Sequence, residues 1–264
     1  MASSIAIASG KGGVGKTSIA VNLGLTMARL GQRVTLLDAD FGLANAHILL
    51  GINPGKTISD VLSGDASIEQ TLTETSSGMR FIGGGSGLNE LLNLDQKTRY
   101  SLIRQMGQLD ATTDQLIIDV PAGASDSSVA FVSAADRVLV VLVGEPTSFL
   151  DAYALIKAAN LEAGVSSFGI VVNMANSQMQ AKSHFEKFRQ TVLRFLDVRL
   201  DYAGSMPMSP RLRQSIIARR PVAMDDKMLK ENQAMLGIAK AVLAMPASSA
   251  GNIRFFDNTD EKKT

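Results

Sequence analysis

The stretch Ala8–Ser18, ASGKGGVGKTS, decides the fold of this chain because it packs four glycines and two lysines into one short segment. It fits the phosphate-binding pattern G-x-x-x-x-G-K-S/T at Gly10, Gly15, Lys16 and Thr17. Glycines let a backbone wrap closely around phosphates with its N–H groups pointing inward, and a following helix adds its positive end. The competing interpretation is a plain glycine-rich turn between a strand and a helix.

A bound nucleoside triphosphate would engage this loop in a defined way. We expect Lys16 to reach the β- and γ-phosphates and the Thr17 hydroxyl to bind Mg²⁺. Further cofactor contacts are expected from the rest of the loop and the first helical turn, at Gly10, Lys11, Gly12, Gly13, Val14, Gly15 and Ser18. Lys11 is not required by the pattern, and a solvated side chain is its simplest interpretation.

Outward from the loop, short apolar runs alternate with helical stretches. Continuous apolar runs are typical of strands covered on both faces, and they occur at 3–9, 33–40, 79–84, 115–120, 137–143, 168–174 and 200–206. Helical patterns occur at 17–30, 148–162, 178–195, 210–219 and 227–244. This alternation predicts an α/β fold, a doubly wound and mostly parallel sheet sandwiched by helices. We expect a single domain over residues 1–245 and a flexible C-terminal tail over 246–264, with one apolar anchor around Phe255.

The amino-acid composition excludes several classes of function for this chain. The chain has 264 residues, of which 45% are hydrophobic and 19% charged, with a net charge of +1. A near-neutral chain gives no global reason to bind nucleic acid or an anionic membrane. It has no cysteine, which excludes disulfides, thiolate metal sites and iron–sulfur ligation. No secretory signal and no run of roughly 18 apolar residues is found, so a cytoplasmic protein is expected.

Three carboxylates follow apolar strands. Asp38 and Asp40 lie in LLDADFGLANAHILLG, and Asp119 ends the apolar part of LIIDVPAG. Ligands of open α/β sheets gather at the carboxyl ends of the strands. One carboxylate of the first pair can serve Mg²⁺ through water and the other can orient the attacking water. Asp119 is suited to hold Mg²⁺ through water, and the turn 121–123 to sense the γ-phosphate. The alternative is that these carboxylates merely cap strand ends.

A base-binding region is expected farther along the chain. Asn173 closes the strand pattern GIVVNM, and an amide can hydrogen-bond both the donor and the acceptor edges of adenine. The segment SMPMS follows the last strand and is expected to flank the ring with Met206, Pro207 and Met208. Asparagine is also common at strand ends for structural reasons, so a structural role remains the alternative.

The loop KGGVGKT resembles the deviant Walker A loop of the MinD/ParA family of dimeric ATPases. The segment from Asp38 also resembles the family pattern D-A-D-x-G-L-x-N, matching at Ala39, Asp40, Gly42, Leu43 and Asn45. The resemblance implies ATP or ADP with Mg²⁺, and a homodimer when ATP is bound. It implies that Lys11 crosses the dimer interface to the partner's phosphates, as an arginine finger does. It further implies that Asp40 is the hydrolytic residue, Asp38 an outer-shell metal residue and Asn173 the base reader.

Within this family the chain is most similar to the FlhG/FleN group of flagellar number regulators. EPTSFLDAYALIK (145–157) and RFLDVRLDYAGSMPMSPRLRQSIIARRPV (194–222) carry this resemblance. It implies that Glu145 lies at the dimer interface near the partner nucleotide. The chain departs from the group pattern at Gly144, usually proline, and at Ser209, usually aspartate. The D-Q-A-x-x-L-R element through which many members stimulate an FlhF-type GTPase does not precede the first strand.

The resemblance implies a slow, partner-regulated ATPase that controls flagellar number or placement. Implied partners are an FlhF-like GTPase, a transcriptional activator or switch-complex proteins. The alternatives are a MinD- or ParA-type positioning ATPase in division or cargo placement, a metabolic P-loop enzyme, and a nucleotide-binding adaptor. The last helical pattern and the segment IRFF could dock on the inner face of a membrane, although core packing explains the helix better. Specific nucleic acid is not expected, and the arginines at 211, 213, 219 and 220, placed on one helix, are expected to be solvated.

Overall fold

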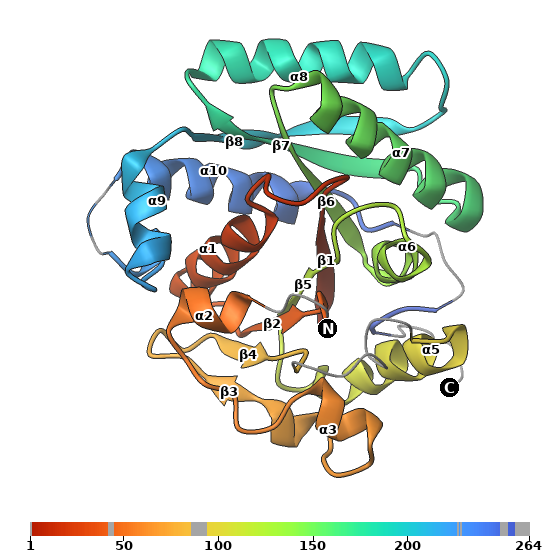
Figure 1. Cartoon of the computed structure of the whole chain (residues 1–264), viewed down its shortest axis with the longest axis vertical. Helices are drawn as coiled ribbons and strands as arrows, with labels where there is room; N and C mark the ends of the chain where they lie inside the picture. Colours follow the sequence, from red (N-terminus) through yellow and green to blue (C-terminus); the bar gives the residue numbers. More distant parts are fainter. Residues whose placement is uncertain are drawn as a thin grey trace.

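The computed structural model describes residues 2–41, 45–85, 94–225, 227, 229–248 and 253–256. Within these residues eight strands form one sheet in the order β3-β4-β2-β5-β1-β6-β7-β8 (Figure 1). The strands are β1 Ser3–Ala8, β2 Val34–Asp38, β3 Thr73–Glu74, β4 Arg80–Ile82, β5 Gln115–Asp119, β6 Arg137–Val143, β7 Ser167–Ala175 and β8 Arg199–Pro207. All neighbouring pairs are parallel except β3 and β4, which are antiparallel. The predicted doubly wound, mostly parallel sheet is confirmed.

Helices cover both faces of the sheet. The described helices are α1 Lys16–Arg29, α2 Ala46–Leu50, α3 Ile58–Leu62, α5 Gln96–Gln105, α6 Asp126–Ala134, α7 Pro146–Ala163, α8 Gln178–Val192, α9 Pro210–Ile217 and α10 Lys230–Ala244. Short 3₁₀ turns lie at Glu69–Thr71, Met106–Leu109 and Val222–Met224. Helices α1 and α10 pack on one face, and α6, α7 and α8 on the other. None of the described helices combines the length and apolar character that crossing a bilayer requires.

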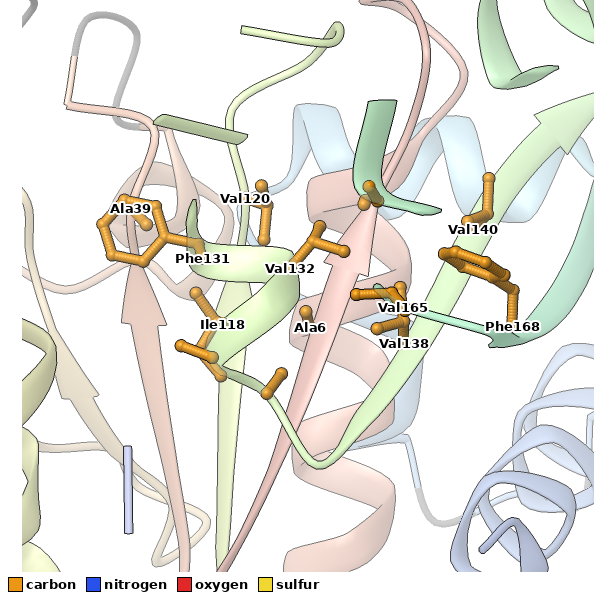
Figure 2. Close-up of a cluster of buried hydrophobic side chains, with 14 of the residues drawn as sticks. Ala6, Ala39, Ile118, Val120, Phe131, Val132, Val138, Val140, Val165 and Phe168 are labelled. Carbon is orange, nitrogen blue, oxygen red and sulfur yellow. The ribbon is translucent and has the colours of Figure 1, made fainter. Parts of the chain in front are cut away.

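The central strands alternate between two apolar layers. In β1, Ile5 and Ile7 pack against α1 and α10, whereas Ala6 and Ala8 face the layer of α6 and α7. Figure 2 shows part of this second layer, in which Phe131 of α6 lies over the strands. Because both faces are buried, the strands are continuously apolar in sequence, as expected.

Several predicted boundaries differ from the observed ones. Strand β2 ends at Asp38, two residues earlier than predicted, because the Asp38 side chain accepts a hydrogen bond from the Asp40 N–H and turns the chain. Helix α7 begins at Pro146, since proline suits the first helical turn. Helix α9 ends at Ile217, and Arg219 has a φ of 52°, so Arg219 and Arg220 do not lie on the predicted helix with Arg211 and Arg213. Helix α10 starts at Lys230 rather than Lys227.

Part of the tail packs on the domain. Phe255 and Phe256 are buried, and the Phe255 ring stacks on Phe131 with centroids 6.3 Å apart. Arg254 contacts the Asp136 carboxylate at 3.1 Å. The tail therefore has an anchor at 253–256 near the end of α6, while residues 257–264 lie outside the described part of the chain.

Candidate nucleotide-binding site

The predicted phosphate loop connects β1 to α1 at the carboxyl edge of the sheet. Gly13 and Gly15 have φ values of 80° and 86°, which side chains rarely adopt, and Gly15 is the residue before the first turn of α1. A side chain at Gly10 would bring its Cβ within 2.0 Å of the Asp151 carbonyl carbon in α7. Glycine is required at these positions because the backbone turns sharply and touches α7. The loop and the N-terminus of α1 thus form an anion-binding concavity.

Lys16 and Asp119 form a buried ion pair in the floor of this concavity. The Lys16 Nζ lies 2.5 Å from Asp119 Oδ1, and both side chains are almost fully buried. The other carboxylate oxygen, Asp119 Oδ2, is buried without a hydrogen-bond partner in the described part of the chain. A buried oxygen of this kind suits a hydrated Mg²⁺, which prefers carboxylate and water oxygens. The residues present therefore fit a magnesium–nucleotide complex, with the Thr17 hydroxyl as the second oxygen ligand.

Asp38 is the cross-strand neighbour of Asp119 in the register of β2 and β5. Burial and the nearby Asp119 charge raise the pKa of Asp38 to about 7, although backbone N–H groups and Lys16 oppose this shift. Burial also raises the pKa of Asp119, while Lys16 and the Thr17 hydroxyl act in the opposite direction. Two adjacent buried carboxylates create a strongly electronegative site that a bound cation would relieve.

Both oxygens of Asp38 are engaged by the backbone. Oδ1 accepts from the Asp40 N–H at 3.2 Å, and Oδ2 accepts from the Ala46 N–H at 3.1 Å. Asp38 thus stabilises the turn that carries Asp40, with a backbone partner for each of its carboxylate oxygens. Asp40 is partly exposed, and its charge is felt at Asp119. The motif residues Gly42 and Leu43 lie outside the described residues.

The predicted γ-phosphate sensor lies against the phosphate loop. The Gly123 N–H donates to the Ser9 carbonyl at 2.8 Å, and Gly123 has a φ of 94°. The Pro121 carbonyl accepts from the Ser128 hydroxyl in α6 at 3.0 Å. A change at this turn would therefore be transmitted directly to α6.

Lys11 is directed to the start of α7. Its Nζ lies 3.0 Å from Glu145 Oε2 and 3.0 Å from Thr147 Oγ1. The Lys11 side chain is 31% exposed and that of Glu145 is 63% exposed. An exposed pair of this kind contributes little stability, about 0–1 kcal/mol, so Lys11 can exchange partners readily. The sequence singled out Lys11 and Glu145 separately but did not reveal that they touch.

The predicted base-binding residues surround a largely apolar cavity of about 520 Å³. Asn173, Met206, Pro207 and Met208 all line it. Asn173 is buried, and its Nδ2 donates to the Val14 carbonyl at 2.7 Å, which connects the cavity to the phosphate loop. We call this cavity the base pocket.

Sequence reasoning missed part of the base pocket wall. The additional lining residues come from α1, the end of β7 and helices α9 and α10: Ile19, Asn22, Met174, Pro210, Leu212, Arg213, Ile216 and Met235. Ser209, the last residue of the predicted segment SMPMS, also lines the cavity. The spacing of Leu212 and Ile216, four residues apart, indicated an apolar helix face, but not what that face covers.

Gly144, one of the positions at which the chain was expected to depart from the family pattern, lies next to His184. A Cβ at this position would approach the His184 ring of α8 to 2.4 Å. His184 also contacts Phe149 of α7 edge-on, with centroids 6.1 Å apart. The His184 ring therefore lies directly against Gly144 and beside Phe149, where α8 meets the start of α7.

A glycine-rich loop between a parallel strand and a helix, with buried carboxylates at the same sheet edge, defines a P-loop nucleotide hydrolase. The model of the ParA family, described as NUBPL iron-transfer P-loop NTPase, matches residues 1–243. The chain therefore belongs to the ParA/MinD family of P-loop NTPases, and it is an ATPase.

Two relatives carry flagellar names. The chain is 39% identical to antiactivator FleN of Pseudomonas aeruginosa, covering 96% of this chain and 91% of the relative. It is 31% identical to flagellum site-determining protein YlxH of Helicobacter pylori, covering 82% and 73% of the two chains.

Among solved structures, MinD of Pyrococcus horikoshii complexed with Mg-ADP has a TM-score of 0.76 at 23% identity, covering 92% of this chain and 96% of that one. MinD in the MinC:MinD complex of Aquifex aeolicus has a TM-score of 0.75 at 25% identity, with the same coverage. The predicted MinD-like fold is confirmed.

Proposed function

We propose that the protein is an ATP-dependent dimerisation switch that regulates flagellar number or placement. The observation that carries the switch is the position of Lys11. Its ammonium is held by Glu145 and Thr147 on the exposed surface, whereas Lys16 alone pairs with the buried Asp119. Lys16 is therefore part of the buried site, whereas Lys11 is available to a second subunit. The names of FleN and YlxH support the flagellar role.

The proposed cycle uses the described residues in order. The phosphate loop and Lys16 would bind ATP, and Thr17 and Asp119 would hold the magnesium ion that accompanies it, which would neutralise phosphate charge. Binding of the triphosphate draws Lys16 away from Asp119, because the phosphates offer more negative charge. Lys11 then leaves Glu145 and contacts the partner's phosphates, where it stabilises charge during phosphoryl transfer. Asp40, partly exposed near Asp38 and Asp119, would orient the attacking water.

The test compares two variants by light scattering and ATP turnover with Mg²⁺. Lys11→Ala should bind ATP yet remain monomeric and lose at least tenfold in turnover, because the cation supplied across the interface is gone. Asp40→Ala should accumulate as an ATP-bound dimer, because assembly proceeds without hydrolysis. Lys240→Ala, which removes an exposed lysine from α10, is the matched control and should behave as the unmodified protein. A monomeric Asp40→Ala protein with ATP bound would contradict the switch.

The flagellar role needs a test in cells. A host strain without this protein should show an altered number or position of flagella by electron microscopy, and Lys11→Ala should fail to restore it. Defects in division or chromosome placement with normal flagella would favour the second candidate, a MinD- or ParA-type positioning ATPase. The family description mentions iron transfer, but the chain has no cysteine to supply thiolate ligands.

A further inference from the structure

Three phenylalanine rings from separate parts of the chain touch one another in series. Phe41 follows Asp40 directly, Phe131 lies in α6, and Phe255 belongs to the tail anchor at 253–256. The Phe41 and Phe131 rings meet edge to face with centroids 6.0 Å apart, and the Phe131 and Phe255 rings are stacked with centroids 6.3 Å apart. All three side chains are buried. These rings, which we call the aromatic stack, connect the tail to the neighbour of Asp40.

The end of the aromatic stack at Phe41 has little room to move. A Cβ at Gly84 would approach Phe41 Cδ1 to 2.6 Å and the Asp38 carbonyl oxygen to 2.9 Å, so the ring lies against the chain after β4. On the other side, the Asp40 N–H donates to the Asp38 side chain at 3.2 Å. Asp40 therefore lies between two restrained neighbours, and a shift of Phe41 would displace its backbone.

The end at Phe255 is fixed by polar contacts that do not involve the phosphate loop. The Phe255 N–H donates to the Ala134 carbonyl at the end of α6, at 3.3 Å. The Arg254 guanidinium contacts Asp136 Oδ1 at 3.1 Å. Asp136 Oδ2 accepts from the Ser4 N–H and from the Ser4 hydroxyl, both at 2.8 Å. The tail anchor is thus attached to α6 and to β1, and it holds the Phe255 ring in its place.

Helix α6 contacts both turns that are expected to respond to the γ-phosphate. The Ser128 hydroxyl donates to the Pro121 carbonyl at 3.0 Å, and Phe131 follows about one helical turn later. Through these two residues α6 touches the predicted γ-phosphate sensor and the segment that carries Asp40. Because protein interiors are close-packed, loss of a ring beside Phe131 lets its neighbours shift into the space.

We infer that Phe255 is a positioning residue for Asp40 and that it acts through the aromatic stack. With the Phe255 ring in place, Phe131 is held against Phe41, and the backbone at Asp40 is fixed. Orienting a water molecule for attack demands accurate placement, and a displacement of about 1 Å can lower a rate on the order of 100-fold. This inference rests on the proposed hydrolytic role of Asp40 and names the residue that supports it.

The experiment measures ATP turnover with Mg²⁺ as phosphate release, at a protein concentration where light scattering shows the same extent of dimerisation for each variant. Phe255→Ala should lower kcat about three- to tenfold, the effect of losing one ring contact. The KM for ATP and the dissociation constant of ADP should stay unchanged, because the phosphate loop and the base pocket are not touched. Phe255→Leu fills most of the space, keeps the fold more securely, and should lower kcat less in the same direction.

The matched control is Phe256→Ala. Phe256 is buried in the same tail anchor, but within the described residues no ring contact joins it to Phe131. It should leave kcat unchanged. An equal fall in kcat in Phe256→Ala would show that attachment of the tail matters rather than the aromatic stack, and it would overturn the inference.

A double variant separates positioning from a general structural effect. In the Asp40→Ala background, Phe255→Ala should lower the residual turnover no further, as expected for two residues that act as one unit. Unchanged turnover in Phe255→Ala, or the same fall with and without Asp40, would overturn the inference and leave Phe255 as a core residue. Full turnover in Asp40→Ala alone would instead overturn the proposed hydrolytic role on which the inference rests.

Discussion

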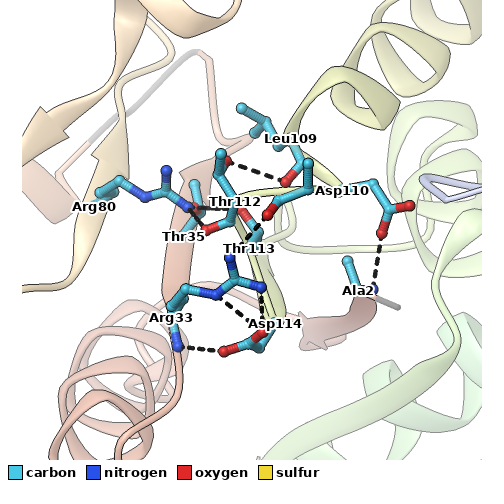
Figure 3. A network of polar contacts seen from close by, with 10 residues as sticks. Ala2, Arg33, Thr35, Arg80, Leu109, Asp110, Thr112, Thr113 and Asp114 are labelled. Atoms are coloured by element: carbon cyan, nitrogen blue, oxygen red, sulfur yellow. Dashed lines mark hydrogen bonds and ion pairs between the residues drawn. The ribbon is translucent and has the colours of Figure 1, made fainter.

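The two ends of the β2–β5 pair carry acidic residues in opposite electrostatic states. At the amino end, Asp114 accepts from the Arg33 N–H at 2.8 Å and from its guanidinium at 2.7 and 3.1 Å (Figure 3). This contact lowers the pKa of Asp114 to about 2. At the carboxyl end of the same strands, burial beside Asp119 raises the pKa of Asp38 to about 7. At the amino end of the two strands, the acidic side chain is thus stabilised in its charged form. At the carboxyl end, burial beside a second carboxylate disfavours the charged form.

This difference separates a polar network that stabilises the fold from a group of carboxylates that is suited to bind a ligand. The amino-end network continues through Arg80, which donates to the Thr113 hydroxyl at 2.8 Å, and Thr113 is 3.0 Å from the Thr35 hydroxyl. This network offers few free groups to a ligand, because the Asp114 carboxylate is already paired with the Arg33 guanidinium. At the carboxyl end Asp119 Oδ2 has no partner within the described residues. An orphaned buried oxygen costs stability, and it is retained where a cation and phosphates are expected to bind.

The largest expected effect comes from breaking the buried pair. Lys16→Met should abolish ATP binding and destabilise the nucleotide-free protein by about 3 kcal/mol, because it leaves Asp119 and Asp38 without a nearby cation. Arg33→Met at the amino end should lower the free energy of unfolding clearly less than Lys16→Met does, since Asp114 remains in contact with water. Urea unfolding of the two variants side by side measures the difference. Equal losses of unfolding free energy in the two variants would contradict the proposed difference between the amino and carboxyl ends of the β2–β5 pair.

A pH series sharpens the comparison at the carboxyl end. Because the pKa of Asp38 is raised from 3.8 to about 7 on folding, the folded protein holds a proton that the unfolded chain releases. Stability therefore falls as the pH rises from about 4 to 7, and Asp38→Asn removes this dependence. Between pH 5 and 8 the stability of Asp38→Asn relative to the unmodified protein should rise on the order of 2 kcal/mol. Thermal unfolding without Mg²⁺ or nucleotide measures it, and a constant difference in melting temperature would refute it.

The smallest effect is expected at the amino end, in acid. The pKa of Asp114 is lowered on folding, so its contribution is present above about pH 4 and is lost as the pH falls toward 2. Arg33→Met removes the guanidinium but keeps the backbone N–H that also bonds Asp114, so it should weaken this dependence, and the variant and the unmodified protein should converge in stability toward pH 2. Circular dichroism melts at pH 4 and pH 2 measure the convergence. A gap that widens in acid would show that Asp114 is not held by Arg33.

The sequence predicted the fold well where patterns are local. Seven strands of the sheet were located because each is an apolar run, but β3 has two residues, Thr73 and Glu74, and leaves no such signal. Helices α2 and α3 were missed because they have only five residues each. Helices α5 and α6 were missed although Asp95 and Ser125 are favoured N-cap residues whose side chains accept backbone hydrogen bonds. The boundary error at β2 arises at a chain turn, where the hydrogen bond from the Asp40 N–H to the Asp38 side chain decides the end of the strand, whereas α10 begins after Leu229 without a side-chain cap.

The sequence by itself determined that this chain builds a phosphate loop at Ala8–Ser18 on a parallel sheet, since strand, glycine spacing and helix are contiguous and their geometry is local. Tertiary structure alone decided that Asp119, beside Asp38, keeps an oxygen with no partner among the described residues, that Lys11 contacts Glu145, and that Ser209 contacts Glu231. These contacts join residues from separate elements. Sheet register and helix packing bring them within hydrogen-bond distance, and no local pattern encodes those distances.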